Sequence, residues 1–143
     1  MDLSQLTETI SEVSPDATFA VVEQLMSDRQ ARITVVIQDG TALGIIAAPE
    51  IARHKAIPEE EASAMRARDG MTALAETMLS STPVKDAARE MRSRRVLYLA
   101  LVDDDGAFEG LVTLRRVLFD VVDELDLKVD NLERELMADG PGG

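Results

Sequence analysis

The chain has 143 residues, of which 45% are hydrophobic and 29% charged, a composition typical of a globular domain with a substantial core. Its formal net charge of -12 argues against broad contact with nucleic-acid phosphates. The absence of cysteine excludes disulfides, zinc ribbons, iron–sulfur clusters and thiol catalysis, and a single histidine excludes multi-histidine metal sites. The N-terminus lacks the features of a signal peptide, and the longest apolar run, Val96 to Val102, is too short to cross a bilayer. We therefore expect a cytoplasmic protein without nucleic-acid or membrane contacts.

The first half of the chain predicts two helices around a hairpin. Thr18 suits the N-cap of a helix whose apolar residues share one face. The β-branched run 33–37 predicts a strand, Asp39-Gly40 a turn with positive φ, and residues 43–47 the returning strand. Pro49 favours the first position of the next helix.

A linker and a second set of elements follow in the same order. The acids at 59–61 predict the first turn of a linker helix, which Asp69-Gly70 is expected to close. The second set comprises a helix at 84–91, a strand at 96–102, a turn at 103–106, a strand at 108–113 and a helix from Leu114.

The sequence beyond the second set stays helical over residues 120–137, and Gly140-Pro141-Gly142-Gly143 is expected to end the helix. Its apolar residues alternate in steps of three and four, the heptad spacing of a coiled coil. They are Val122, Leu125, Val129, Leu132 and Leu136. Valine at a with leucine at d favours a parallel two-stranded coil, in which Lys128 of one chain faces Glu133 of the other. The alternative is that this stripe packs back on its own chain.

Three landmarks recur in the same order in both halves. Leu6-Thr7-Glu8-Thr9-Ile10 returns as Leu74-Ala75-Glu76-Thr77-Met78. The stretch from Thr18-Phe19 to Met26 returns as Pro83-Val84 to Met91, and Asp39-Gly40 with Gly44-Ile45-Ile46 returns as Asp105-Gly106 with Gly110-Leu111-Val112. A unit of about 45 residues buries too little surface to be stable alone, so the two units are expected to pack together.

The order of elements, with Gly44-Ile45-Ile46 and Gly110-Leu111-Val112-Thr113 at matched positions, resembles a tandem pair of CBS domains, a Bateman module. The resemblance implies an α/β (α+β) fold in which two β-α-β-β-α units pack with pseudo-twofold symmetry, followed by a C-terminal helix. It also implies a regulatory, non-catalytic module that binds an adenosine-containing nucleotide between its units and signals to a partner protein. We expect a stand-alone module with no further domain.

Four segments follow from this interpretation. They are residues 1–55 as the first unit, 56–72 as a helical linker, 73–122 as the second unit and 123–143 as a C-terminal extension. Modules of this kind commonly pair, so we expect a homodimer formed by the units, the C-terminal helix or both.

The resemblance also suggests ligand groups where each unit's last strand leads into its last helix. The family motif has a glycine, a hydroxyl and, three residues later, an acid. The first unit has Gly44 but Ala47 in the hydroxyl position, followed by Glu50; the second has Gly110 and Thr113 but Arg116 in the acid position. The candidate ligand-binding residues are Thr113, Arg116, Arg115, Glu50, Gly110 and Gly44. The candidate ligands are AMP, ADP, ATP or S-adenosylmethionine, and no cofactor is required.

Two interpretations of the incomplete motifs stay open. The bases concentrated in residues 85–116 either form an anion site with Thr113 or merely pair with surface acids such as Asp103–Asp105. The module is correspondingly either a nucleotide sensor or a ligand-deficient pair that serves as a dimerisation scaffold. No catalytic group is predicted, and His54, between Arg53 and Lys55, is expected to be solvated rather than a metal ligand.

Overall fold

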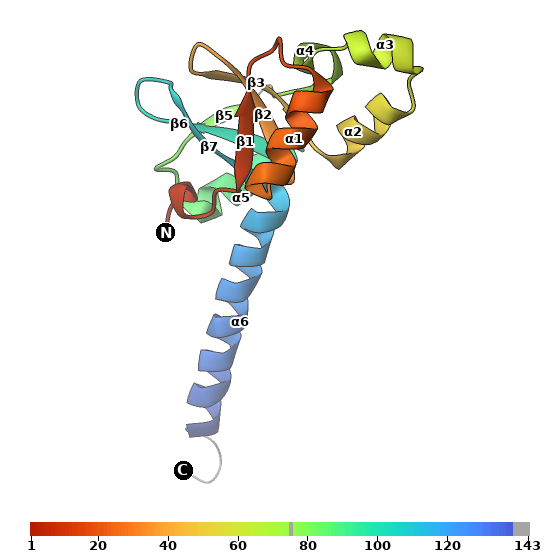
Figure 1. Cartoon of the computed structure of the whole chain (residues 1–143). Coiled ribbons are helices and arrows are strands. Elements are labelled where there is room, and N and C mark those ends of the chain that lie inside the picture. Colours follow the sequence, from red (N-terminus) through yellow and green to blue (C-terminus); the bar gives the residue numbers. More distant parts are fainter. Residues whose placement is uncertain (75, 139–143) are drawn as a thin grey trace.

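The computed structural model describes residues 1–74 and 76–138 of the chain. Two small sheets form a body from which one long helix projects (Figure 1). The first unit contains η1 (Leu3–Gln5), β1 (Ile10–Val13), α1 (Phe19–Arg29), β2 (Ile33–Gln38), β3 (Thr41–Ile46) and α2 (Ala48–Lys55). Next come α3 (Glu59–Ala64), α4 (Ala67–Gly70) and β4 (Thr72–Ala73). The second unit contains β5 (Thr77–Leu79), α5 (Val84–Arg94), β6 (Tyr98–Val102), β7 (Phe108–Thr113) and α6 (Leu114–Ala138).

The two sheets share one connectivity. In the first, β1 pairs in parallel with β2 and β2 antiparallel with β3; in the second, β5, β6 and β7 repeat this order. The repeated β-α-β-β-α order predicted from the sequence is therefore confirmed, as are the turns. Asp39 and Gly40 have φ of 53° and 77°, and Gly106 has φ of 85°. Part of one landmark of the repeat, Ala75, lies outside the described residues.

Each unit's last strand is covered by the segment that leads into the other unit's first strand. β4 pairs with β3, and the Leu74 N–H donates to the Leu43 carbonyl at 3.0 Å. In the other direction, the Glu8 N–H donates to the Leu111 carbonyl at 2.9 Å. This exchange places Glu8 beside the end of β7, although more than a hundred residues separate the two in sequence.

The core is aliphatic and has a part shared by the two sheets. Residues from both units meet there: Ile33, Val35, Ile45, Ala47 and Leu111 are buried together, with Tyr98 and Phe108 packed against them. Burial of a Leu, Ile or Val side chain stabilises a fold by ~1.5–3 kcal/mol, so this cluster holds the units together.

The linker departs from the sequence prediction because it forms two short helices, α3 and α4, instead of one. Met65 and Arg66 between them are extended, with ψ of 136° and 166°. The break lets the linker bind the start of α1. The Ala67 N–H donates to the Ala17 carbonyl at 2.7 Å, and the backbone of Arg66 pairs with that of Thr18 in an isolated antiparallel β-bridge. These tertiary hydrogen bonds outweigh the continuation of a helix.

The prediction that His54 is solvated is wrong. Its ring stacks on Phe19 with centroids 4.1 Å apart, and its Nε2 lies 2.8 Å from the Ala62 carbonyl oxygen. The aromatic contact and the carbonyl together fix α2 and α3 against α1. The sequence placed this histidine among charged neighbours, but the chain folds Phe19 beneath it.

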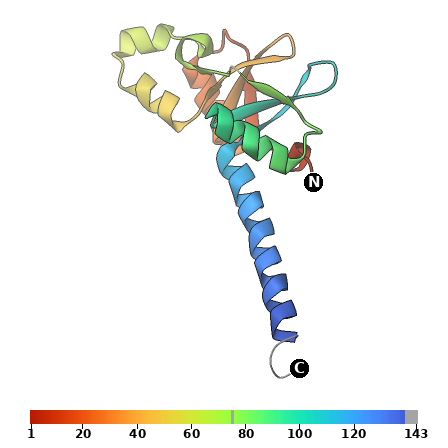
Figure 2. The same ribbon diagram turned by 180° about the vertical axis from the view of Figure 1, so that it is seen from behind.

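Helix α6 confirms the predicted helical extension and leaves the body after its first turns (Figures 1 and 2). Val117 and Val121 pack against α5 and the N-terminal segment. Farther along, Leu125, Leu132 and Leu136 are 55%, 58% and 72% exposed, so the stripe does not pack back on its own chain. The predicted stop at 140–143 lies outside the described residues. Among residues 1–74 and 76–138, no helix has the length and apolar character needed to span a membrane.

Candidate functional site

A cleft of about 850 Å³ opens where α2 and α6 begin, with walls from both units. Its lining pairs equivalent positions of the repeat, because each unit contributes the start of its middle strand and the start of its last helix. The lining residues are Glu8, Arg32, Ile33, Ala47, Ala48, Pro49, Leu97, Tyr98, Thr113, Leu114, Arg115, Leu118, Phe119 and Val122. The volume lies within the range of ordinary small-molecule sites.

Thr113 lies at the end of the cleft where β7 becomes α6. Its Oγ1 accepts a hydrogen bond from the Arg116 N–H at 3.2 Å and donates one to Glu8 Oε1 at 2.9 Å. The first bond makes Thr113 the N-cap of α6, because it satisfies one of the N–H groups that a helix start leaves without a partner. The second holds the Glu8 carboxylate at the cleft wall.

Two guanidinium groups line the same cleft as the Glu8 carboxylate. Arg32 and Arg115 are exposed and line the cleft, and neither forms an ion pair within the part of the chain that the structure describes. Arg115 lies over the Phe119 ring, with its Cζ 5.7 Å from the ring centroid. The charged lining is therefore two cations and one anion, in a chain whose net charge is -12. Such a site favours an anionic ligand that also carries hydroxyl donors.

Tyr98 is one of two aromatic residues in the described lining of the cleft, with Phe119. Burial, foremost, and then the negative charges of Glu50 and Glu8 raise the pKa of its phenol above the ordinary value of 10.0. Since the chain has one tyrosine and no tryptophan, its near-ultraviolet absorbance and fluorescence at long wavelength report on this cleft alone.

We expect an absorbance titration at 295 nm to give a pKa for Tyr98 above 10.0 in the folded chain and close to 10.0 in urea. Because the folded-state pKa is raised, the folded chain holds the proton more tightly, and stability falls as the pH rises from 10.0 through the folded-state pKa. Glu8→Gln should lower the pKa but leave it raised, since burial is the larger cause. A folded-state value at or below 10.0 would contradict the placement of Tyr98 in the cleft.

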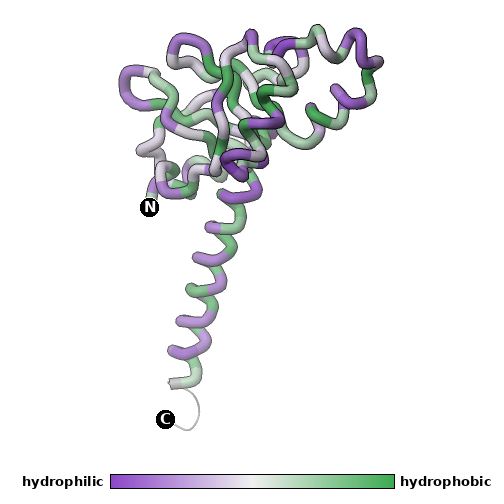
Figure 3. Tube along the Cα trace, viewed as in Figure 1, coloured by the Kyte–Doolittle hydropathy of each residue, from purple (hydrophilic) through white to green (hydrophobic). Residues whose placement is uncertain are grey.

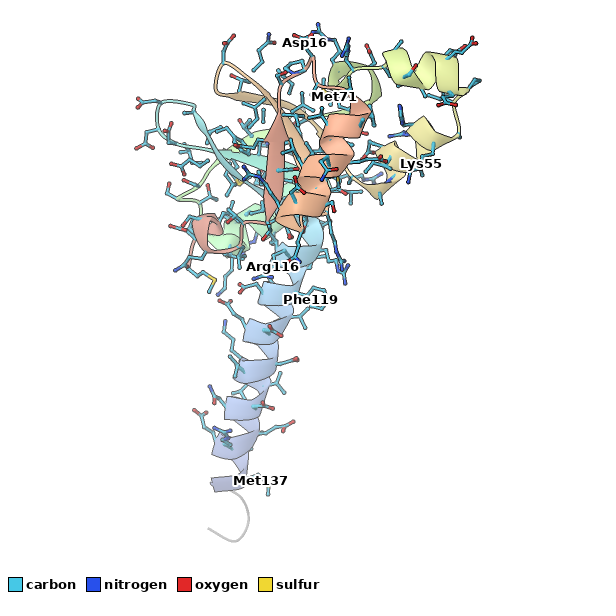
Figure 4. The ribbon with its side chains drawn as sticks, in the orientation of Figure 1. Asp16, Lys55, Met71, Arg116, Phe119 and Met137 are labelled. Carbon is cyan, nitrogen blue, oxygen red and sulfur yellow. The ribbon has the colours of Figure 1, made fainter. Side chains whose placement is uncertain are left out.

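The residues predicted from the sequence divide into two groups. Thr113 and Arg115 line the cleft, whereas Arg116, Glu50, Gly44 and Gly110 do not. Arg116 lies on the first turns of α6, next to Phe119 (Figure 4), and contributes its backbone N–H to the Thr113 cap.

Glu50 is 6% exposed and its carboxylate is fully engaged by groups of α2 and β4. Its Oε1 accepts from the Ala47 N–H at 2.7 Å, and its Oε2 accepts from Arg53 at 2.9 Å and from the Thr72 hydroxyl at 3.0 Å. The carboxylate thus caps the start of α2 and ties it to β4.

The two glycines lie under the crossing segments. A Cβ on Gly44 would meet Met71 and the Thr72 carbonyl, and a Cβ on Gly110 would meet the Thr7 side chain. Their missing side chains let each segment lie directly on the neighbouring strand.

Three polar residues of the cleft were not predicted from the sequence: Glu8, Arg32 and Tyr98. The repeat could have identified Tyr98, because Tyr98 and Ile33 begin equivalent strands, beside Thr113 and Ala47 respectively. Nothing local marks Glu8 or Arg32, which reach the cleft only through the packing of one unit on the other. No group of three or more Asp, Glu or His side chains suited to a metal ion occurs among the described residues.

A family model described as "CBS domain" matches residues 75–123, and no curated protein matches the chain. The CBS domain of a CBS domain-containing membrane protein from Sphaerobacter thermophilus is 25% identical, with a TM-score of 0.68 over 82% of this chain and 86% of that one. CBSX2 in complex with AMP is 20% identical, with a TM-score of 0.65 over 85% and 96% of the two chains. The CBS domain of the bacterial CNNM/CorC family Mg²⁺ transporter in complex with ATP is 18% identical, with a TM-score of 0.70 over 85% and 87%.

These matches indicate no catalytic family. The likeness to the solved structures spans both units, and the family match covers the second of them. Residues 75–123 therefore match the CBS-domain family, and the chain has the overall fold of the CBS-domain structures.

Proposed function

We propose that the chain is a regulatory module that binds an adenosine nucleotide in the cleft between its units and passes the binding event to a partner protein. The observation that carries the proposal is the charged lining of the cleft. Two arginines without ion pairs in the described structure and a carboxylate held by Thr113 surround an otherwise apolar space. CBSX2 with AMP and the transporter CBS domain with ATP support the choice of ligand.

Each part of a nucleotide has a counterpart in this lining. The base would lie against Tyr98 and Ile33, since an aromatic ring and a branched aliphatic side chain suit a flat heterocycle. Glu8 would accept hydrogen bonds from the ribose hydroxyls, the role that the resemblance gives to an acid that the second unit lacks. Arg32 and Arg115 would bind phosphate, aided by the positive end of the 25-residue helix α6.

The route to a partner is α6 itself. Its first turn forms a wall of the cleft through Leu114 and Arg115, and its later turns project from the body (Figure 1). A ligand that shifts the first turn relative to the first unit tilts the whole helix, so a small local movement becomes a large displacement at its far end.

Thermal unfolding with AMP, ADP, ATP and S-adenosylmethionine tests the proposal. A ligand present at 100 times its Kd stabilises the folded state by about 2.7 kcal/mol, which raises the Tm of a domain this size by several degrees. We expect such a rise with at least one adenine nucleotide and at least tenfold weaker binding by Arg32→Ala, as measured by calorimetry. Arg92→Ala on α5, an exposed arginine outside the cleft, is the matched control and should bind like the wild type.

Glu8→Gln tests whether the Glu8 carboxylate binds the ribose hydroxyls. We expect this variant to lose the preference for a ribonucleotide over its 2′-deoxy form while keeping the phosphate contacts. Equal binding of all the compounds by wild type and Arg32→Ala would contradict the cleft as the site.

A second candidate function is a ligand-deficient scaffold. Ala47 removes the hydroxyl from one motif, and Glu50 is already saturated by three hydrogen bonds, so half of the expected pair of sites is altered. The absence of a Tm shift with every adenosine compound at millimolar concentration would favour this function over nucleotide sensing.

A further inference from the structure

We propose that α6 binds α6 of a second copy of this chain in a parallel coiled coil, and that this second copy covers the mouth of the cleft. This pairing needs no bound nucleotide. The body leaves one continuous apolar stripe of α6 uncovered, and the second copy that covers this stripe also completes the cleft wall.

The stripe, called the α6 seam below, runs along the full length of the helix in steps of four and three residues. Its members are Leu118, Val122, Leu125, Val129, Leu132 and Leu136. They are 45% to 72% exposed, and in Figure 3 apolar and polar positions alternate along the projecting helix. A seam of this spacing that the body leaves uncovered is the surface that a coiled coil buries.

The seam continues into the cleft. Leu118 and Val122 belong to the seam and also line the cleft, and the neighbouring Phe119 and Leu97 are 57% and 65% exposed. Phe119 lies at the body end of α6 and Met137 at the far end (Figure 4). A helix that packs along the seam therefore extends over the cleft mouth, and its own Leu118 and Val122 join the opposing wall.

The charges beside the seam favour a parallel second copy. With Val122, Val129 and Leu136 at position a, Lys128 is at g and Glu133 at the following e, so each copy's lysine faces the other's glutamate. An antiparallel arrangement opposes e with e and g with g, so the repulsion of Asp126 and Glu133 offsets the attraction of Lys128 and Glu135. The attraction occurs twice in a parallel pair because the pair is symmetric.

The acidity of the helix does not oppose this pairing as strongly as its net charge suggests. Asp120, Asp123, Glu124 and Asp130 occupy positions b, c and f, which point away from a partner helix. Val117 and Val121 contact α5 and the N-terminal segment on a different face of α6, so the body does not compete for the seam.

Multi-angle light scattering on the full chain tests whether a second copy binds through the α6 seam. We expect a dimer for the wild type and a shift to monomer, or at least a tenfold weaker dimer, for Leu125→Glu combined with Leu132→Glu. Leu127→Glu is the matched control: Leu127 is 64% exposed on the same helix, but it occupies position f. A monomeric wild type, or equal weakening by Leu127→Glu, would overturn the inference and leave the seam to a different protein.

A cysteine test fixes the orientation, since the chain has no cysteine of its own. Val129→Cys should form an intermolecular disulfide under mild oxidation, because equivalent a positions adjoin only in a parallel, in-register pair. Leu127→Cys should not. A disulfide in both variants or in neither would contradict the parallel coil.

Acrylamide quenching of Tyr98 fluorescence tests the cover over the cleft. We expect at least twofold stronger quenching in the Leu125→Glu, Leu132→Glu variant than in the wild type or Leu127→Glu, although none of the three substitutions touches the cleft. Equal quenching with a confirmed dimer would overturn the cover and retain the coil. Because no nucleotide is added, these outcomes stay separate from success or failure of nucleotide binding.

Discussion

Replacing Glu50 by alanine should lower the free energy of unfolding by about 2–4 kcal/mol, the cost of breaking a buried, charge-assisted hydrogen-bond group. The substitution leaves the Ala47 N–H at the start of α2 without its acceptor and releases both Arg53 and the Thr72 hydroxyl. The carboxylate is 6% exposed, so water cannot readily replace it. Urea denaturation should show a lower midpoint with an unchanged slope.

Two further variants serve as comparisons for Glu50→Ala. Glu50→Gln keeps an acceptor for the Ala47 N–H and should lose less stability than Glu50→Ala. Glu109→Ala removes an exposed acid and should change stability by less than about 0.5 kcal/mol. A Glu50→Ala protein with wild-type stability but lost nucleotide binding would instead assign the carboxylate to a ligand, as the resemblance implied.

Much of the fold could be predicted from local signals. Thr18 caps α1 and Asp39-Gly40 forms a turn with positive φ, because each acts through its own backbone neighbourhood. The helical extension followed from an unbroken periodic pattern, and α6 spans it. The order of elements followed from the repeat, since a duplicated pattern constrains both halves at once.

The parts that sequence missed depend on contacts between distant segments. The linker breaks into α3 and α4 because Ala67 donates to Ala17 across fifty residues. His54 is held by Phe19, which no spacing within α2 could indicate.

The candidate site also depends on a contact between segments that are distant in the sequence. Thr113 was found because it ends a recognisable strand, but the acid beside it comes from Glu8 at the other end of the chain. The family motif places that acid three residues after the hydroxyl, where this chain has Arg116. The exchange of edge segments between the units supplies the carboxylate from a different place, and only the fold reveals it.

The same exchange predicts unequal effects at the two motif glycines. We expect Gly44→Ala to lower the free energy of unfolding by about 2–3 kcal/mol and Gly110→Ala by less than about 1 kcal/mol, within the range for overpacked cores. A Cβ on Gly44 would lie 2.7 Å from the Thr72 carbonyl oxygen and 2.6 Å from Met71 Sδ. A Cβ on Gly110 would lie 2.7 Å from Thr7 Cγ2, the end of an exposed side chain.

The difference arises from what can move. Thr7 can change rotamer, whereas the Thr72 carbonyl belongs to β4, which pairs with β3 and whose threonine hydroxyl donates to Glu50. Urea denaturation measures both variants, and adding Thr7→Ala should restore Gly110→Ala, while Thr72→Ala should not restore Gly44→Ala because the clash is with backbone. Equal losses at the two glycines would contradict the rigid packing of β4 on β3. A loss of nucleotide affinity without a loss of stability would show that both glycines serve ligand binding instead of packing.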